Sequence, residues 1–394
     1  MPRQTFAELS RVQAAVLTSP KKISERPLTI AEVARPALAA GQVLLRVRAC
    51  GVCRTDLHIV EGELPSLRPQ IIPGHQIVGE IIEGSAGNDP ISEARRGTAN
   101  DVSKGATNDV RKGTASAVPK SAAPEVGRPS STPVYDTPSI ELPAGSRVGV
   151  SWLGGVDGHC PYCRRGLENL CDNPTFTGYT VDGGYAEFAL ARADFVFPLP
   201  TALDDVHAAP LLCAGIIGFR SIRVAGVIPC ERVGLFGFGA SAHLAIAVLN
   251  AWKCEVYVST RGESHRKLAA SLGAKWVGAE DEKLPVQLDR AITFAPSGAV
   301  VLAALGSLRK GGVVAINAIH LDQMPAFDYD KLLWGERQIR SVTNMTRADA
   351  RDFLDTAAQI GLRPTATVFP LAQANEALLA VKSDAINGAA VLVP

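Results

Sequence analysis

The sequence lacks an excess of charge of either sign, and it lacks any long hydrophobic run. Its 40 Lys and Arg residues are balanced by 39 Asp and Glu residues, which gives a formal net charge of +1 at pH 7. A nucleic-acid or anionic-membrane partner would favour a basic excess or cluster, and neither is present. No apolar run approaches the roughly 20 residues of a membrane span, and Met1 to Gln13 has no signal-peptide core. We therefore expect a soluble, cytoplasmic protein with no nucleic-acid or membrane partner.

Secretory features that would favour disulfides are also missing, although the chain has eight cysteines. Cys160-Pro-Tyr-Cys163, followed by Cys171, has the spacing of a metal-binding knuckle. These thiols are therefore expected to hold a metal rather than to form disulfides.

The first part of the chain is rich in short apolar runs separated by Gly and Pro, which indicates strands over residues 11–83. The same pattern returns at Ser146–Trp152 and Gly184–Leu190. Between these parts, residues 85–137 are polar, small and partly repetitive, so they cannot bury enough apolar surface to offset the chain entropy of folding. We expect a disordered insertion in a surface loop; the alternative is a partner-binding arm.

Helical and strand patterns alternate from residue 202 onward, beginning with a predicted helix at Asp204–Val224. Regular alternation of this kind predicts a parallel sheet that is covered by helices on both faces. The final segment, Gly388–Pro394, is an apolar strand that needs another sheet to join. The sequence thus predicts an α/β protein with a β-rich domain over residues 1–215, a doubly wound domain over residues 216–340, and a return of residues 341–394 to the first domain.

A glycine-rich loop follows one predicted strand and opens the next helix. Gly237-Phe238-Gly239-Ala240-Ser241-Ala242 has the form Gly-x-Gly-x-x-Ala, the spacing that lets backbone approach a pyrophosphate at a helix N-terminus. Within a series of strand–helix units, Gly237, Gly239 and Ala242 predict a nicotinamide dinucleotide site. A plain glycine-rich turn is the alternative.

The end of the next predicted strand lacks the acidic residue that usually binds the ribose 2′-hydroxyl of NAD. Thr260 stands near that position, and Arg261 follows it. Without a carboxylate, a 2′-phosphate is not repelled, and Arg261 could pair with it. This pattern favours NADP(H) over NAD(H) as the cofactor; the alternative is that Arg261 is an ordinary surface charge.

Three widely separated residues form a potential catalytic metal set. Cys53, His75 and Cys213 would give zinc three protein ligands and leave its fourth position open, as in catalytic rather than structural zinc sites. Taken singly, each could be a buried core residue instead. Near Cys53, the side chain of Asp56 is suited to orient a ligand histidine.

Two further side chains near Cys53 could carry a proton. Thr55 supplies a hydroxyl and His58 an imidazole, and together they could move a proton from a bound alcohol to solvent.

Five motifs occur in order and carry a family resemblance. They are Cys-Arg-Thr-Asp-Leu-His at 53–58, Gly-His-x-x-x-Gly-Glu at 74–80, Cys-x-x-Cys followed by Glu-Asn-Leu-Cys at 160–171, Gly-Tyr-Thr-Val-Asp-Gly-Gly-Tyr-Ala-Glu at 178–187, and Leu-Leu-Cys-Ala-Gly at 211–215. The chain resembles the zinc-dependent alcohol dehydrogenases of the medium-chain dehydrogenase/reductase superfamily, and most closely the bacterial members grouped with cinnamyl alcohol dehydrogenases. The resemblance covers nearly the whole chain except residues 85–137.

This resemblance implies a GroES-like catalytic domain packed on a Rossmann domain, with the active site in the cleft between them. It implies reversible hydride transfer between NAD(P)(H) and a primary alcohol or aldehyde, and assembly into dimers or tetramers. Trp152 and Leu153 lie where the family lines its substrate pocket, which suits medium-chain or aryl alcohols; ordinary core packing is the alternative. The implied site residues are zinc ligands Cys53, His75 and Cys213, relay residues Thr55 and His58, and Arg54 on the pyrophosphate.

Two departures from the family pattern stand out. Gln76 replaces the glutamate that usually follows the ligand histidine, so ligand exchange or turnover is expected to be slower. In the structural zinc lobe, Asp157 replaces the first of four cysteines, ahead of Cys160, Cys163 and Cys171. A carboxylate oxygen can bind zinc, and His159 is a nearby substitute, but the lobe could also hold no metal.

Two rival functions remain at this stage. A zinc-free quinone or enoyl reductase of the same superfamily would lack the three metal ligands that this chain has. A nucleotide-binding sensor that kept the fold and lost turnover is compatible with Gln76 and Asp157.

Overall fold

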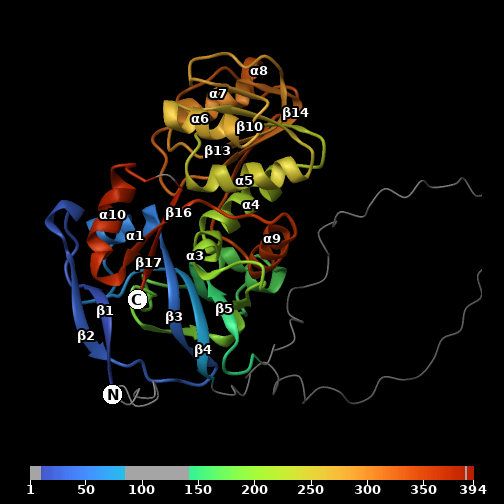
Figure 1. Cartoon of the computed structure of the whole chain (residues 1–394). Helices are drawn as coiled ribbons and strands as arrows, with labels where there is room; N and C mark the ends of the chain where they lie inside the picture. Colours follow the sequence, from blue (N-terminus) through green and yellow to red (C-terminus); the bar gives the residue numbers. More distant parts are fainter. Residues whose placement is uncertain (1–9, 85–141, 387) are drawn as a thin grey trace, which may run out of the picture.

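The computed structural model describes residues 10–84, 142–386 and 388–394, so the predicted insertion at 85–137 lies outside the described residues. Figure 1 shows two parts, one built around β3, β4 and β5 and the other around β10, β13 and β14. The chain passes from the first part to the second through α4, and its last strand lies back in the first. The α/β architecture with two separate sheets is thereby confirmed.

The first part contains a seven-stranded sheet in the order β16-β17-β3-β4-β5-β9, with β8 also paired to β3. The C-terminal strand β17 runs antiparallel to β3, with Val391 opposite Gly51. The domain boundaries predicted above stay a prediction. The strands of this part are β1 (Arg11–Leu17), β2 (Leu28–Ala34), β3 (Gln42–Val52), β4 (Gln76–Gly84), β5 (Arg147–Val150), β6 (Leu153–Gly155), β7 (Thr175–Phe176), β8 (Phe188–Arg192), β9 (Val196–Pro198), β16 (Ala366–Pro370) and β17 (Ala389–Val393).

The second part is a six-stranded, fully parallel sheet in the order β12-β11-β10-β13-β14-β15. Its inner strands are apolar and buried, as a parallel sheet covered on both faces requires. Its strands are β10 (Arg232–Phe236), β11 (Glu255–Ser259), β12 (Trp276–Gly278), β13 (Leu288–Thr293), β14 (Leu308–Ile316) and β15 (Gln338–Ser341). The longer helices are α4 (Ala214–Ala225), α5 (Ala240–Ala251), α6 (Glu263–Ser271), α7 (Gly298–Gly306) and α9 (Arg347–Gln359).

The helix predicted at Asp204–Val224 is wrong as a single element. The structure has α3 (Asp205–Ala208), a 3₁₀ turn at Ala209–Leu212 and then α4, with Cys213 between them at φ −132° and ψ −70°. Pro210 within the turn cannot donate a backbone hydrogen bond, which favours a break at this point.

The same break divides an apolar helical stretch. Among the described residues, no single helix is both long and apolar enough to cross a membrane. Asp205–Leu212 and Ala214–Ala225 reach that length and composition only together, across a bend of 43°.

Three other helices were not predicted. The eight residues of α1 (Arg54–Glu61) stand between β3 and β4, where the sequence indicated strands only, and α10 (Ala374–Lys382) precedes the last strand; a further short helix is α8 (Tyr329–Leu332). Helix α1 begins at Cys53, which acts as its N-cap, and Asp56 completes a capping box. Cys-x-x-Asp is therefore the local signal that could have revealed this helix.

A buried ion pair joins the cysteine-rich lobe to α9. Glu168, in a 3₁₀ turn of the lobe, accepts hydrogen bonds from the backbone N–H of Arg347 and from its guanidinium, at 2.5–2.9 Å. The side chains of Glu168 and Arg347 are only 5% and 12% exposed. The Arg347 guanidinium also lies over the ring of Phe195, 4.5 Å from its centroid. The ion pair between Glu168 and Arg347 thus connects the lobe to the start of α9.

Candidate active site

Three residues from separate segments form the first candidate metal cluster. Cys53 lies at the N-cap of α1, His75 directly before β4, and Cys213 at the break before α4. Their ligand atoms all lie within 4.8 Å of one another, and Cys53 Sγ is 3.3 Å from His75 Nε2. Two sulfurs and one imidazole nitrogen, converging from three segments, match the donor set of a zinc site with one open position.

Asp56 orients the residues of this cluster through hydrogen bonds. Its carboxylate accepts hydrogen bonds from the N–H of Cys53 (2.9 Å), from the N–H of Gly74 (3.2 Å) and from Nδ1 of His75 (2.9 Å). With Nδ1 of His75 donating to Asp56, Nε2 is the nitrogen left to face the cluster. Both side chains are fully buried. The sequence-based role of Asp56 as an orienting carboxylate is consistent with these contacts.

The pKa directions differ within the cluster: the hydrogen bond between the two thiols lowers the pKa of Cys53 and raises that of Cys213. The hydrogen bond from Cys213, and then the charge of His75, hold the pKa of the Cys53 thiol well below its usual value. Burial tends to lower the pKa of His75, but the charge of Asp56 more than offsets this and raises the pKa overall. A depressed thiol pKa favours the thiolate, which is the form that binds metal.

A close backbone approach holds the His75 segment in place. A Cβ atom on Gly183 would lie only 2.0 Å from the carbonyl oxygen of Gly74, and one on Gly74, which has φ +96°, would lie 2.3 Å from the ring of Tyr185. The backbone N–H of Gly184 donates to the same Gly74 carbonyl at 2.8 Å. No side chain fits between these two segments.

Replacing Gly183 by alanine is therefore expected to lower the free energy of unfolding by about 1–3 kcal/mol, the usual cost of overpacking. The backbone next to His75 must shift to admit the methyl group. Gly84→Ala is the matched control, because its added Cβ would meet only a side-chain carbon of Val43 at 3.5 Å. Urea unfolding of both variants checks this; equal stabilities would contradict it.

Three other residues of α1 are site residues that the family resemblance implies: Arg54, Thr55 and His58. Thr55 is buried, and its backbone N–H donates to Cys53 Sγ at 3.3 Å. His58 makes a short hydrogen bond through Nδ1 with the carboxylate of Glu63. Arg54, expected on the pyrophosphate, pairs with Asp384 at 2.7 Å and is exposed.

An aromatic stack lies against the first cluster. The ring of Trp152 meets His75 edge-on at 5.1 Å between centroids, and it stacks on Phe176 at 4.9 Å and on Tyr179 at 5.9 Å. Phe176 and Tyr179 were not predicted; Tyr179 belongs to the motif at 178–187. Leu153 is fully buried in the hydrophobic core, so it packs there rather than beside Trp152.

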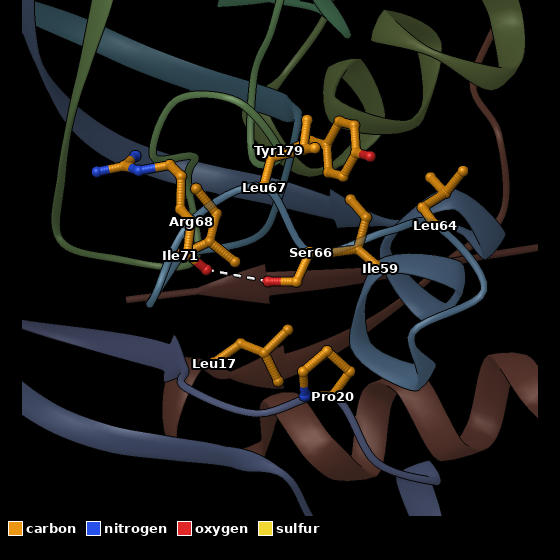
Figure 2. Close-up of a pocket in the computed structure, with 9 residues that line it drawn as sticks. All are labelled: Leu17, Pro20, Ile59, Leu64, Ser66, Leu67, Arg68, Ile71 and Tyr179. Carbon is orange, nitrogen blue, oxygen red and sulfur yellow. Dashed lines mark hydrogen bonds between the residues drawn. The ribbon is translucent and has the colours of Figure 1, made fainter.

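Tyr179 also lines a small pocket, shown in Figure 2. The free space within it, about 10 Å³, holds about one water molecule. It is therefore too small for an alcohol with an aromatic ring. Its lining residues are Leu17, Pro20, Ile59, Leu64, Ser66, Leu67, Arg68, Ile71 and Tyr179.

A second cluster contains the ligand atoms of four residues within 4.8 Å of one another: Asp157, Cys160, Cys163 and Cys171. The carboxylate of Asp157 accepts from the N–H of Cys160 (3.0 Å), from that of His159 (2.9 Å) and from the amide of Asn173 (3.0 Å). These hydrogen bonds, led by that from Cys160, hold the pKa of Asp157 below its ordinary range.

His159 is the other candidate for the first ligand position of this lobe. Its side chain is 76% exposed, and its Nδ1 bonds to the backbone carbonyl of Asp157 at 2.8 Å. The structure therefore brings Asp157, and not His159, into the four-residue cluster.

The glycine-rich loop leaves the carboxyl end of β10, between the neighbouring strands β11 and β13, where the strand order reverses. This is the switch point at which doubly wound sheets bind dinucleotides. Gly237 has φ +84°, Gly239 is the N-cap of α5, and Ala242 is fully buried. The loop has the form that its motif predicts.

The turn after β11 contains the two residues predicted near the ribose, Thr260 and Arg261. Thr260 is buried, whereas Arg261 is 79% exposed and lies 3.2 Å from Glu280. Arg266 of α6, which was not predicted, donates to the backbone carbonyls of Thr260 (3.1 Å) and Arg261 (2.7 Å). The arginine thus braces this turn from the next helix.

One half-buried histidine next to the loop was also missed. Burial lowers the pKa of His243, in the first turn of α5, to about 4, and its Nε2 finds no hydrogen-bond partner among the described residues. Its neutral form is therefore present at pH 7.

Comparisons with known proteins identify the family. The model of the alcohol dehydrogenase GroES-like domain matches residues 39–122 and 126–201, and that of the zinc-binding dehydrogenase domain matches residues 242–359. A probable alcohol dehydrogenase of Mycobacterium tuberculosis is 42% identical over 98% of this chain and 99% of its own length. An alcohol dehydrogenase of Geobacillus stearothermophilus is 32% identical over 97% and 98%.

Solved structures share the fold. A cinnamyl alcohol dehydrogenase from Sorghum bicolor superimposes with a TM-score of 0.75 and 20% identity, covering 97% of each chain. A thermostable alcohol dehydrogenase from Pyrobaculum aerophilum gives a TM-score of 0.76 and 21% identity over 98% of this chain and 100% of the other. Together with the domain matches, these likenesses confirm the resemblance seen in the sequence. The chain belongs to the zinc-dependent alcohol dehydrogenases of the medium-chain dehydrogenase/reductase superfamily.

Proposed function

We propose that this protein interconverts primary medium-chain or aryl alcohols with their aldehydes and uses NADP(H) in preference to NAD(H). The observation that carries the proposal is the cluster of Cys53, His75 and Cys213, with His75 held in one tautomer by Asp56, on a chain that also has a dinucleotide loop. An alcohol dehydrogenase needs both parts: a group that activates the alcohol and a cofactor that accepts the hydride.

The residues of the first cluster fit a catalytic zinc by their chemistry. Cys53, His75 and Cys213 would hold the ion, and Asp56 would orient His75 toward it. When bound, zinc acts as a Lewis acid that lowers the pKa of the alcohol and polarises the aldehyde carbonyl. Thr55 and His58 would then carry the released proton outward along α1.

The aromatic stack supports an apolar substrate. Trp152 meets His75 edge-on, so an aromatic ring lies directly against the cluster. Phe176 and Tyr179 stack on that ring and make this side of the cluster aromatic. Aromatic and apolar walls favour a medium-chain or aryl group over a strongly polar one.

A panel of aldehydes incubated with NADPH tests this proposal. The expected result is oxidation of NADPH with at least one aryl or medium-chain aldehyde, and loss of that activity after chelation. Cofactor binding without turnover would favour the sensor, and turnover that survives complete removal of metal would favour the zinc-free reductase.

We propose a structural zinc for the second cluster. Asp157, Cys160, Cys163 and Cys171 offer one oxygen and three sulfurs, and their convergence supports four-coordinate binding. A homo-oligomer and a cytoplasmic location stay predictions.

The preference for NADP(H) gives a specific prediction. Arg261→Ala is expected to raise KM for NADPH about tenfold, the loss of one charge-assisted contact, and to change KM for NADH little. Lys267→Ala is the matched control, since Lys267 is an exposed cation of α6 paired with Glu263. Initial rates with both cofactors measure this; an equal change for NADPH and NADH would contradict a 2′-phosphate contact.

A further inference from the structure

Two histidines from different domains meet at their junction. His58 lies on α1 of the catalytic domain, and His320 lies in the segment that follows β14 of the nucleotide-binding domain. Their rings contact edge to face, with centroids 5.6 Å apart and planes inclined at 84°. Each domain therefore contributes one imidazole to this contact.

The surroundings of His58 leave one ring nitrogen for this contact. The turn that ends α1 brings Glu63 back, because the backbone N–H of Glu63 donates to the carbonyl of His58 at 2.9 Å. The Glu63 carboxylate then bonds to Nδ1 of His58. Since Nδ1 is engaged, Nε2 is the nitrogen that can exchange a proton with another group.

Exposure to solvent increases from Thr55 to His58 to His320. Thr55, one helical turn before His58 on α1, is buried; His58 is partly buried, and His320 is exposed. Residues three apart on a helix share one face, so Thr55 and His58 lie in line. A proton that moves from Thr55 to His58 therefore meets His320 where the protein ends and solvent begins.

The charged groups near the two histidines have partners of their own, and none of these partners is His320. On the α1 side, Glu63 bonds to His58, and Glu61 is paired with Lys382 of α10 at 2.7 Å. On the other side, Asp322 accepts from the backbone N–H of Gly298 within its own domain.

We propose that His320 is the second imidazole of the proton relay and that it delivers the proton to solvent. During alcohol oxidation, the hydride goes to the cofactor and one proton is released. The Nε2–H bond of protonated His58 breaks, a bridging water passes the proton to a ring nitrogen of His320, and His320 then loses a proton to bulk water. Aldehyde reduction runs the same steps in reverse. The inference rests on the proposed function, and it makes proton exit dependent on contact between the two domains.

His320→Phe tests this, because phenylalanine keeps a ring at the contact but carries no proton. In weakly buffered solution, kcat for alcohol oxidation is expected to fall about tenfold. This is less than the 10²–10⁴-fold effect of a direct general base, since water can replace an outer carrier. Added imidazole is expected to restore most of the rate, and the solvent deuterium isotope effect on kcat is expected to rise. Ile319→Ala, an exposed neighbour in the same segment, should match wild type.

Two results would overturn the relay. One is a His320→Phe enzyme with the wild-type rate in weak buffer. The other is a loss of rate that imidazole does not restore, which would assign His320 to packing between the domains. A wild-type protein that binds cofactor and oxidises no alcohol would instead refute the proposed function.

Discussion

Replacing Cys53 by alanine is expected to lower turnover at least ~10³-fold and to remove one zinc per chain. Loss of the ion removes several kcal/mol of transition-state stabilisation, and each 1.36 kcal/mol corresponds to a factor of ten in rate. Cys53 serves the site in two ways, since its sulfur belongs to the cluster and also accepts the N–H of Thr55 at the start of α1. Steady-state rates and metal analysis on the same preparation measure both effects.

Cys50→Ala is the matched control for this variant. Cys50 is a fully buried thiol of β3, three residues before Cys53, but it lies outside the cluster. Its removal is expected to leave the zinc content unchanged and kcat within a few-fold of wild type. If Cys53→Ala and Cys50→Ala lost activity equally, the loss would reflect packing and not metal binding.

Glu168→Ala is expected to lower the free energy of unfolding by about 3 kcal/mol, the low end of the cost of removing one partner of a buried ion pair. The variant leaves the guanidinium of Arg347, which is 12% exposed, with its longer contact to Asp194 at 3.4 Å, and it removes the carboxylate that accepts the backbone N–H of Arg347 at the start of α9. The lobe that carries Asp157 would also lose a main attachment to α9. Urea unfolding of the metal-loaded protein measures this change.

Glu263→Ala provides the comparison. Glu263 pairs with Lys267 on the surface of α6, with both side chains more than 70% exposed, and such pairs contribute less than about 1 kcal/mol. The account requires the Glu168 variant to be clearly less stable than the Glu263 variant. Similar unfolding curves would show that the ion pair to α9 adds little.

The sequence predicted the nucleotide-binding domain well because its chemistry is local. Strands buried on both faces read as continuous apolar runs, as at Arg232–Phe236 and Glu255–Ser259, and both bounds agree with β10 and β11. The glycine loop needs Gly237 and Gly239 for a tight turn and for the close approach of a pyrophosphate. Both glycines can be recognised in one sequence by their spacing.

The details of the metal sites depend on contacts between distant segments, so spacing could not decide them. The apolar run at Asp204–Val224 hides the break that places Cys213, because its residues are buried on either side of it. Spacing left both Asp157 and His159 open as the first ligand of the lobe, and only the turn geometry separates them. The His58–His320 contact joins two domains and leaves no local pattern at all.

Zinc content per chain, in protein purified without added metal, tests the central claim most directly. The account predicts two zinc ions per chain: one on Cys53, His75 and Cys213, lost in Cys53→Ala, and one on the lobe of Asp157. One ion that disappears with Cys53→Ala would keep the catalytic site and refute metal binding at the lobe. No zinc, in a protein that still binds its cofactor, would contradict the proposed mechanism.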